Sequence, residues 1–236
     1  MNESKFVCYI PARGWSRRLP RKNFLPFVNG RSLVEVTIKQ ALNCGLFRNI
    51  VIDTDSENEL SSLKAKFPSV DGSLRCSHLA GDQTDTVTVL QGAIQRNKEI
   101  FQDYDVVVMQ PTSPLRRFES LSSALDYFVD ESLDLLVSVS DTIINPNDII
   151  FFCGDKVYSM KNLCETPPGV SQYYFETGQF YVASQKRLIE GVNALKPRNT
   201  TELFRTNPLD FVDIDYDYQF RLAQLLYNEI DHGCQP

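Results

Sequence analysis

The chain has 236 residues, of which 42% are hydrophobic, and its formal net charge is −6. That length supports one sizeable core but is short for two, so a single domain spanning 1–236 is expected. The acidic balance argues against a nucleic-acid binder, and no apolar run is long enough to cross a membrane. Six cysteines without C-x-x-C spacing, and no signal-peptide pattern at the first residues, predict a cytoplasmic protein with reduced thiols.

The first half of the chain alternates strand-like and helix-like segments. Short apolar runs predict strands, and spacings of three and four residues predict the helices between them. The helix after Ser56 opens with an S-x-x-E capping box. This alternation is typical of an α/β fold with a doubly wound, mainly parallel sheet. The predicted strands are 6–10, 49–52, 105–109 and 133–139, and the predicted helices are 32–44, one from Ser56, 86–96 and 118–129.

The pattern changes after Ser140. Two apolar runs, 149–152 and 156–158, flank Gly154-Asp155 and predict a β-hairpin instead of another strand and helix. We interpret about 140–175 as an excursion from the main sheet. Returning strands are expected at 178–183 and 211–214, followed by a closing helix over 218–230.

A basic loop follows the first predicted strand. Residues 11–23 contain five cations and no acid, in a chain that is acidic overall. Arg13, Arg17 and Lys22 are spaced so that their charges could converge on a triphosphate, and Gly14 permits close approach of the backbone. The alternative is a solvated basic turn, but the position at a strand end favours phosphate binding. The loop is neither a Walker loop nor a Rossmann fingerprint.

A second polar turn follows the strand at 105–109. The segment 110–116, Gln-Pro-Thr-Ser-Pro-Leu-Arg, supplies an amide, two hydroxyls and a guanidinium. Its two prolines stiffen the turn, so these groups could be preorganised for a ligand. An ordinary strand-to-helix turn is an equally good interpretation of this segment alone.

Two Asp-x-Asp segments are candidate oxygen sites. Asp213-Ile214-Asp215 places both carboxylates on one face of a predicted strand, which suits Mg²⁺ held by carboxylates and phosphate oxygens. Asp53-Thr54-Asp55 resembles the start of a haloacid-dehalogenase-type phosphatase. That alternative is weak, because Glu57 stands where the phosphatase motif requires Thr or Val and the strand is the second one.

Together, these segments closely resemble the acylneuraminate cytidylyltransferase family. The segment 10–23 fits the family's opening motif, Gln-Pro-Thr-Ser-Pro-Leu-Arg stands unaltered at 110–116, and the late Asp-Ile-Asp precedes a helix. Three motifs in the right order are far more specific than any one of them. The opening motif is matched at Ala12, Arg13, Ser16, Arg17, Pro20, Lys22 and Asn23.

The resemblance implies an enzyme that couples CTP to a nonulosonate, a nine-carbon 2-keto acid sugar, and releases pyrophosphate. It assigns catalysis to Arg13, Lys22 and Asp215, and Mg²⁺ to Asp213 and Asp215. It also implies a homodimer in which the excursion at 140–175 packs against the neighbouring site. CTP would be bound by Ala12, Arg13, Gly14, Ser16, Arg17, Lys22, Asn23, Thr86 and Arg116, and the sugar by Gln110, Thr177, Gln179 and Tyr181.

Departures from the family pattern bear on the sugar. Relatives that use N-acetylneuraminate commonly carry an arginine before the aromatic stretch, where this chain has 167–170, Pro-Pro-Gly-Val, and Asn-Gly where it has Thr177-Gly178. Residues 176–181, Glu-Thr-Gly-Gln-Phe-Tyr, resemble the Asp-Ala-Gly-Gln-Phe-Tyr of pseudaminate-type relatives. A legionaminate-like or pseudaminate-like sugar is therefore favoured. Kdo, an eight-carbon sugar, and a non-catalytic nucleotide-binding module are the alternatives.

Overall fold

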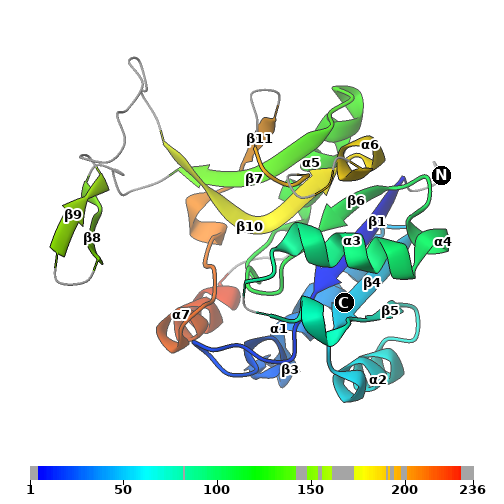
Figure 1. Ribbon diagram of the computed structural model, residues 1–236, viewed down its shortest axis with the longest axis horizontal. Coiled ribbons are helices and arrows are strands. Elements are labelled where there is room, and N and C mark those ends of the chain that lie inside the picture. Colours follow the sequence, from blue (N-terminus) through cyan, green and yellow to red (C-terminus); the bar gives the residue numbers. More distant parts are fainter. Residues whose placement is uncertain are drawn as a thin grey trace.

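A seven-stranded sheet forms the centre of the molecule (Figure 1). The computed structural model describes residues 5–81, 83–141, 148–153, 156–160, 173–189, 191, 194–197 and 201–229. The strand order is β11-β7-β10-β6-β1-β4-β5, and only β10 runs antiparallel to its neighbours. The strands are β1 (Phe6–Pro11), β4 (Asn49–Thr54), β5 (Asp71–Leu74), β6 (Asp105–Val108), β7 (Leu135–Asp141), β10 (Tyr174–Ala183) and β11 (Glu202–Arg205).

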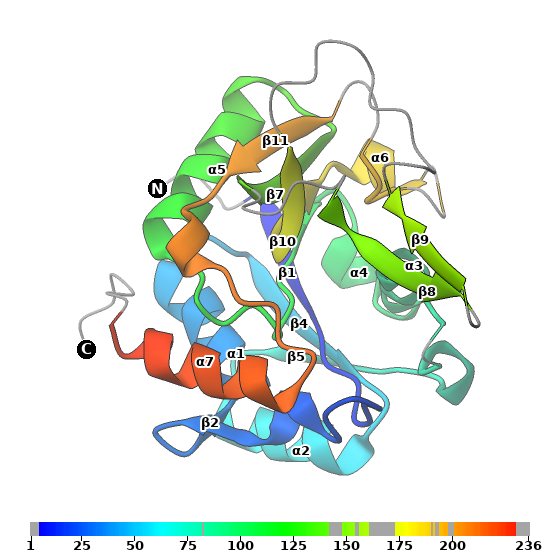
Figure 2. The ribbon, with the colours of Figure 1, turned by 90° about the vertical axis from the view of Figure 1, so that its left-hand side faces the viewer.

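Helices cover both faces of this sheet (Figure 2). On one face, α1 (Leu33–Cys44), α2 (Glu57–Lys66) and α5 (Phe118–Asp130) pack against alternate residues of the strands. On the other, α3 (Thr86–Arg96), α4 (Lys98–Phe101) and α6 (Gln185–Ile189) cover the intervening residues. The predicted doubly wound, mainly parallel architecture is confirmed, because the buried strands alternate apolar side chains between two helical layers. No described helix is long and apolar enough to span a membrane.

Local sequence signals set the ends of the first helices. Ser32 caps α1 in a reciprocal box with Glu35, and Gly45 ends the helix with a φ of 64°. Ser56 caps α2 by accepting a hydrogen bond from the backbone N–H of Glu59. The predicted start of α2 and the predicted boundaries of α1, α3 and α5 are confirmed within a residue or two.

The prediction of a strand at 211–214 was wrong. That segment runs without a strand partner, and the sheet is completed instead by β11, which pairs with β7. Val212 and Ile214 are buried in a third cluster with α7 (Asp217–Tyr227) and β2 (Pro26–Val28). Their alternation with polar residues therefore arises from packing beside the sheet instead of within it. β2 pairs with β3 (Arg31–Ser32) in a small two-stranded sheet, and neither β2, β3 nor the polar edge strand β5 was predicted.

The predicted hairpin is confirmed. β8 (Ile150–Cys153) and β9 (Lys156–Ser159) pair antiparallel in a sheet of their own, which projects from the main body (Figure 1). The side chains of Ile150 and Val157 are 65% and 61% exposed. Other parts of the predicted excursion, at 142–147, at the turn 154–155 and at 161–172, lie outside the described residues, as does the end of the predicted last helix at Ile230.

Candidate functional site

The candidate site lies where the chain reverses its direction of winding across the sheet. From β1 the chain adds β4 and β5 on one side and then returns to place β6 on the other. The loops that leave the carboxyl ends of β1 and β6 separate at this point, which leaves a crevice between them. A cavity of about 280 Å³ occupies it. Its lining is Pro11, Arg13, Lys22, Asn23, Arg75, Gly81, Thr84, Thr86, Val89, Gln110, Pro111, Thr112, Asp213 and Asp215.

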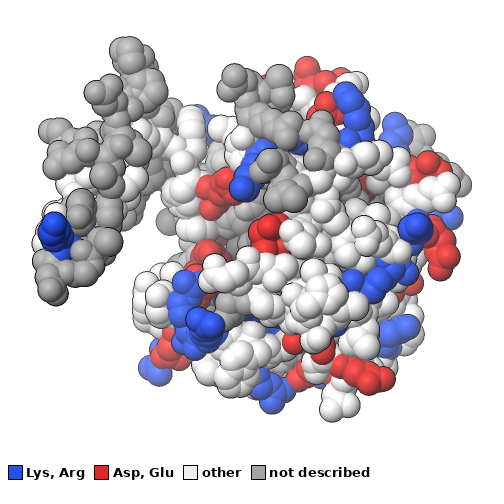
Figure 3. Space-filling model, in the orientation of Figure 1, with Lys and Arg blue, Asp and Glu red and all other residues white. Residues whose placement is uncertain are grey.

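A second cavity of about 220 Å³ adjoins the first, because both are lined by Arg13, Lys22 and Asp215. Its other lining residues are Gln83 and four residues of the basic loop, Ser16, Arg17, Arg18 and Leu19. Acidic and basic surfaces meet along the hollow left of centre in the space-filling view (Figure 3). The predicted phosphate-binding and metal-binding residues thus line connected cavities, although they are almost 200 residues apart in the sequence.

Backbone contacts hold the basic loop in place. The backbone N–H of Ala12 donates to the Asp53 carbonyl at 2.8 Å, and that of Gly14 donates to the Asp55 carboxylate at 2.7 Å. Asn23 closes the loop by donating from Nδ2 to the Arg13 carbonyl at 3.1 Å. A side chain at Gly14 would place its Cβ 3.3 Å from the Cβ of Ser56, so glycine suits this close packing. The loop is therefore anchored at both ends, which limits the entropy lost on binding a ligand.

Two polar atoms of this loop are buried without a partner among the described atoms. They are Ser16 Oγ and Asn23 Oδ1, on side chains that are 3% and 4% exposed. Leaving a polar group unsatisfied costs about 1–3 kcal/mol. Since Ser16 lines the smaller cavity and Asn23 the larger one, a polar ligand in the cavities could satisfy both atoms.

Asp215 lies among cations. Lys22 donates from Nζ to Asp215 Oδ1 at 2.7 Å and to the Ile214 carbonyl at 2.6 Å, and Arg18 forms a further ion pair with Asp215 Oδ2. Burial acts to raise the pKa of Asp215, but the hydrogen bonds and charges of Lys22 and Arg18 outweigh it and lower the pKa below its usual value. This carboxylate is therefore ionised over the physiological pH range.

The negative charge of Asp213 is compensated by neighbouring groups much less than that of Asp215. Burial raises the pKa of its carboxyl, and the charge of Asp215 raises it further. A hydrogen bond from Thr112 and the charges of Lys22 and Arg18 lower it without reversing the shift. Both carboxylates line the larger cavity, and a bound cation would relieve their mutual repulsion. The side chains present therefore fit a divalent cation.

Arg116 is buried next to the site and lines neither of these two cavities. It is 2% exposed, and burial lowers the pKa of its guanidinium to about 10, so it remains charged. It donates to the carbonyls of Gln179 at 2.6 Å and Gln110 at 3.0 Å, and to Gln40 Oε1 at 2.7 Å. These bonds join the segment 110–116 to β10, which is a positioning role rather than a contact with a ligand.

The residues predicted to bind the sugar fall into two groups, those that line the cavity and those that are bonded within the protein. Gln110 lines the larger cavity, whereas Thr177 and Gln179 are buried and bonded to the protein. Thr177 donates to Ser138 Oγ at 2.8 Å, and Gln179 donates from Nε2 to the Asp210 carbonyl at 3.0 Å. The hydroxyl of Tyr181 donates to Glu176 at 3.0 Å, and burial raises its pKa.

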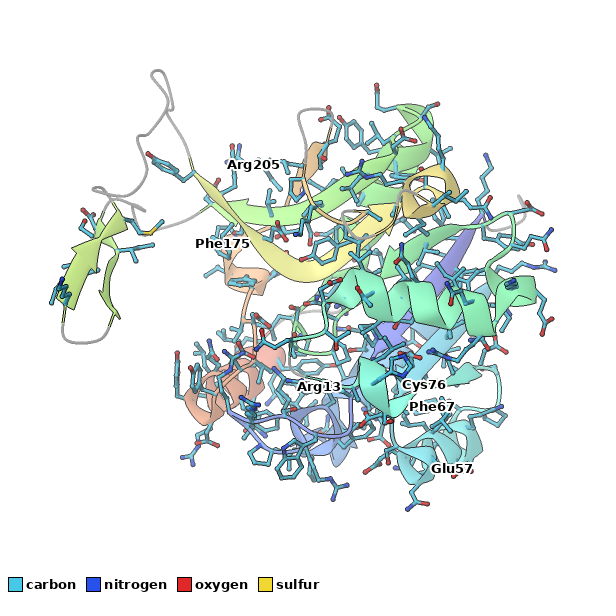
Figure 4. All side chains as sticks on the ribbon, in the orientation of Figure 1. Arg13, Glu57, Phe67, Cys76, Phe175 and Arg205 are labelled. Carbon is cyan, nitrogen blue, oxygen red and sulfur yellow. The ribbon has the colours of Figure 1, made fainter. Side chains whose placement is uncertain are left out.

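Gly178 explains why β10 approaches Gln110 so closely. Its φ is 64°, and a Cβ there would lie 2.6 Å from Gln110 Oε1. Only glycine meets both requirements without displacing the amide. Arg13, from the first loop, and Phe175, from β10, lie on opposite sides of the gap between the two halves of the molecule (Figure 4).

Comparison with known proteins places this geometry in a family. A family model described as cytidylyltransferase matches residues 7–229. The chain belongs to the cytidylyltransferase family. This bears out the resemblance seen in the three sequence motifs, and it identifies the protein as a nucleotidyltransferase.

Named relatives cover almost the whole of this cytidylyltransferase. It is 27% identical to a pseudaminic acid cytidylyltransferase of Campylobacter jejuni over 97% of this chain and 98% of that protein. It is 26% identical to a CMP-N,N'-diacetyllegionaminic acid synthase of Legionella pneumophila, covering 94% and 96% of the two chains. A solved CMP:2-keto-3-deoxy-manno-octonic acid synthetase complexed with CTP has the same fold, with a TM-score of 0.70 and 16% identity over 96% of this chain and 99% of that one.

One residue of the cytidylyltransferase site was missed from the sequence. Arg75 lines the larger cavity, and it is held by the fully buried Asp53, to which its Nε donates at 2.8 Å. Asp53 also accepts from Arg96 at 2.7 Å and from the Tyr9 hydroxyl at 3.0 Å. The sequence signal for this residue was its position, because Arg75 directly follows β5. It was overlooked because β5 was not predicted. With its oxygens enclosed in this way, Asp53 has no access to a phosphate ester, which excludes the phosphatase interpretation.

Proposed function

We propose that this cytidylyltransferase couples CTP to a sialic-acid-like nonulosonate and releases the CMP-sugar and pyrophosphate. The observation that carries the proposal is the convergence of Arg13, Lys22 and the Asp213–Asp215 pair on connected cavities at the switch point of the sheet. Oligophosphates need several cations and a divalent metal around them, and this is the charge arrangement present. The family membership and the names of the full-length relatives support the same reaction.

The nucleotide would occupy the basic side of the site. Arg13, Arg17 and Lys22 would contact the triphosphate, and Ser16 and Asn23 would bind it through the polar atoms that lack a protein partner. The backbone from Ala12 to Gly14 would approach the phosphates closely. Arg75 and Thr86, which also line the larger cavity, would contact the ribose or the base.

The Asp213 and Asp215 carboxylates would hold Mg²⁺. When bound, the ion would neutralise phosphate oxygens and polarise the substrate groups that it contacts. Asp215 would be ionised for this role, because Lys22 and Arg18 hold its pKa low. Lys22 would thus bind both the Asp215 carboxylate and the phosphates.

The reaction itself would be an in-line displacement. The oxygen of the sugar's anomeric hydroxyl would form a bond to the α-phosphorus and lose its proton to solvent, the bond from that phosphorus to its bridging oxygen would break, and pyrophosphate would leave. Arg13 and Lys22 would stabilise the negative charge on the phosphoryl oxygens during this step. Because little covalent chemistry is required of the protein, its contribution would be alignment and charge neutralisation.

The sugar would lie on the β10 side. Gln110 would bind it directly, while Thr177, Gln179 and Tyr181 would fix β10 and Arg116 would hold the backbone of Gln110 in place. We infer a pseudaminate-like or legionaminate-like substrate, because the full-length relatives carry those names and the sequence at 176–181 agrees.

We also propose a cytoplasmic homodimer. Ile150 and Val157 on the projecting hairpin are exposed apolar side chains, which a neighbouring subunit would cover. A hairpin that leaves the body of the protein can reach a second subunit without altering the sheet. Sedimentation of the wild type beside a variant with Val157→Lys would test this: the wild type is expected as a dimer and the variant as a monomer.

The reaction is tested by pyrophosphate release from CTP and Mg²⁺ with N-acetylneuraminate, legionaminate, pseudaminate and Kdo. Release is expected with a legionaminate-type or pseudaminate-type sugar. Arg13→Ala is expected to raise KM for CTP, whereas Arg221→Ala, at an exposed position on α7, is expected to leave it unchanged. CTP binding without release from any sugar would instead favour a nucleotide-binding module, and release with Kdo alone would favour the eight-carbon substrate.

A further inference from the structure

A third cavity, of about 340 Å³, lies away from the proposed CTP site. It is enclosed by α1, the start of α5 and the end of α7, which lie together on one side of the sheet (Figure 2). It shares no lining residue with the two cavities that we assign to CTP. The lining is Arg31, Val36, Lys39, Gln40, Asn43, Cys44, Arg116, Arg117, Phe118, Leu121 and Tyr227.

The charged side chains that line this cavity are all positive. Four of its described lining residues are cations and none is a carboxylate, in a protein whose net charge is −6. Arg117 is paired outside the cavity with Asp210, at 2.7 Å. Arg116 is buried, and its three hydrogen bonds to described residues all go to neutral oxygens, so no carboxylate in the described part of the chain pairs with its charge. Arg31 and Lys39 are half-buried at the same lining. A bound anion would supply the missing negative charge.

The lining also has an apolar part. Besides the polar Gln40 and Asn43, it includes Val36, Leu121 and the rings of Phe118 and Tyr227. The α5 helix begins at Phe118, and no side chain caps its first turn, so the positive end of that helix also faces this region. A ligand that satisfies both parts of the lining would carry an anionic group and a flat or branched apolar group.

We propose that this cavity binds a small organic anion, a phosphate monoester or carboxylate with an apolar substituent, and that its occupancy acts on the sugar side of the site. Gln40 and Arg116 connect the two places. Gln40 accepts from Arg116 and donates to the Pro114 carbonyl at 2.7 Å, and Arg116 holds the carbonyls of Gln110 and Gln179. An anion that draws the Arg116 guanidinium toward the cavity would weaken those bonds. The binding is independent of the proposed function, whereas the effect on the sugar rests on it.

Binding is tested by calorimetric titration with phenyl phosphate in the presence of saturating CTP, which keeps the nucleotide site filled. One molecule is expected to bind, inorganic phosphate more weakly, and benzyl alcohol not at all. Arg31→Gln and Lys39→Gln are each expected to weaken binding roughly tenfold, because each removes one of the converging charges. Lys98→Gln is the matched control, since it removes an exposed lysine on α4 and should change nothing. Binding unaffected by Lys39→Gln, or no saturable heat, would overturn the proposal.

A second measurement uses the wild-type protein alone. Cys44 lines the cavity, whereas Cys76 is exposed elsewhere, at the start of the turn after β5. Phenyl phosphate is expected to slow alkylation of Cys44 by iodoacetamide, followed by peptide mass mapping, and to leave Cys76 unaffected. Equal labelling of Cys44 with and without phenyl phosphate would contradict occupancy of the cavity.

The connection to the sugar side has its own test. Phenyl phosphate is expected to change KM for the sugar with KM for CTP unchanged, and the effect should disappear in Lys39→Gln. If phenyl phosphate binds and no kinetic constant changes, the connection through Arg116 is wrong while the binding site stands. Absence of turnover with every sugar would count against the proposed function and not against this cavity.

Discussion

The two Asp-x-Asp segments share one pattern and have different surroundings. Asp53 lies near the end of β4 and Asp55 directly follows it, and their oxygens bind groups of the protein itself. Asp213 and Asp215 precede α7 and line the cavity at the switch point. The difference lies in access from a cavity. Asp53 is enclosed in the interior with its oxygens bound, whereas Asp213 and Asp215 line a cavity from which a cation could reach them, although Lys22 and Arg18 already pair with Asp215.

Asp53 shows the first case most fully. It is completely buried and receives Arg75, Arg96 and the hydroxyl of Tyr9, which leaves both of its oxygens occupied. Through Arg75 it also shapes the wall of the larger cavity. Asp213 shows the second, because its pKa is raised by burial and by Asp215 even though Thr112 donates to it. The same residue type thus stabilises the fold in one place and lines a cavity in the other.

The largest effect is expected from Asp53→Asn. The change leaves two guanidinium groups, those of Arg75 and Arg96, without their carboxylate in the interior, and breaking such a buried pair costs about 3–5 kcal/mol. Urea unfolding should therefore show a large fall in the free energy of unfolding. Asp126→Asn, at an exposed position on α5, is the matched control and should leave it unchanged. Equal stability of the two variants would show that the Asp53 cluster does not hold the fold.

Next in size is the effect of Asp215→Asn on catalysis. Loss of one proposed metal-ligand charge should lower kcat/KM at least about 10²-fold, or about 2.7 kcal/mol of transition-state stabilisation. Asp55→Asn, the equivalent position of the other segment, should retain most activity, because an amide oxygen can still accept from the N–H of Gly14. Pyrophosphate release measures both. Activity lost equally in the two variants would remove the distinction between the segments.

The smallest effects are opposite changes in the stability of the ligand-free protein. The lowered pKa of Asp215 contributes stability that is present above the unfolded-state pKa of about 3.9 and lost as the pH falls through the lower folded value. The raised pKa of Asp213 has the reverse sign, because stability falls as the pH rises from the unfolded value through the folded one.

Consequently, Asp215→Asn should destabilise the protein at pH 7, and Asp213→Asn should stabilise it. Each change is expected to be about 1 kcal/mol, since both groups are partly buried. Thermal unfolding measured from neutral to acidic pH should show the two differences shrinking as both carboxyls become protonated. Differences of the same sign at pH 7 would mean that Asp213 is compensated in the folded protein.

Strong local signals carried most of the fold prediction. The buried strands β1, β4, β6 and β7 stand out as apolar runs, and Ser32, Gly45 and Ser56 mark helix ends through their own backbone chemistry. The strand predicted at 211–214 was wrong because alternating apolar residues indicate only that every second residue is buried. A loop packed on α7 meets that condition as well as a strand does. The strand β5 was missed because Asp71-Gly72-Ser73 is polar and lies at the sheet edge.

By itself, the sequence determined the α/β architecture, the family and the polar groups of the two strand ends, because strand periodicity, helix caps and short motifs are local properties of the chain. Only the tertiary structure decided which charges act together. Arg75 entered the site, and Thr177, Gln179 and Arg116 became supports for it, through contacts between residues far apart in the sequence. The physical reason is that a side chain's role depends on which partners already satisfy it, and the fold sets those partners.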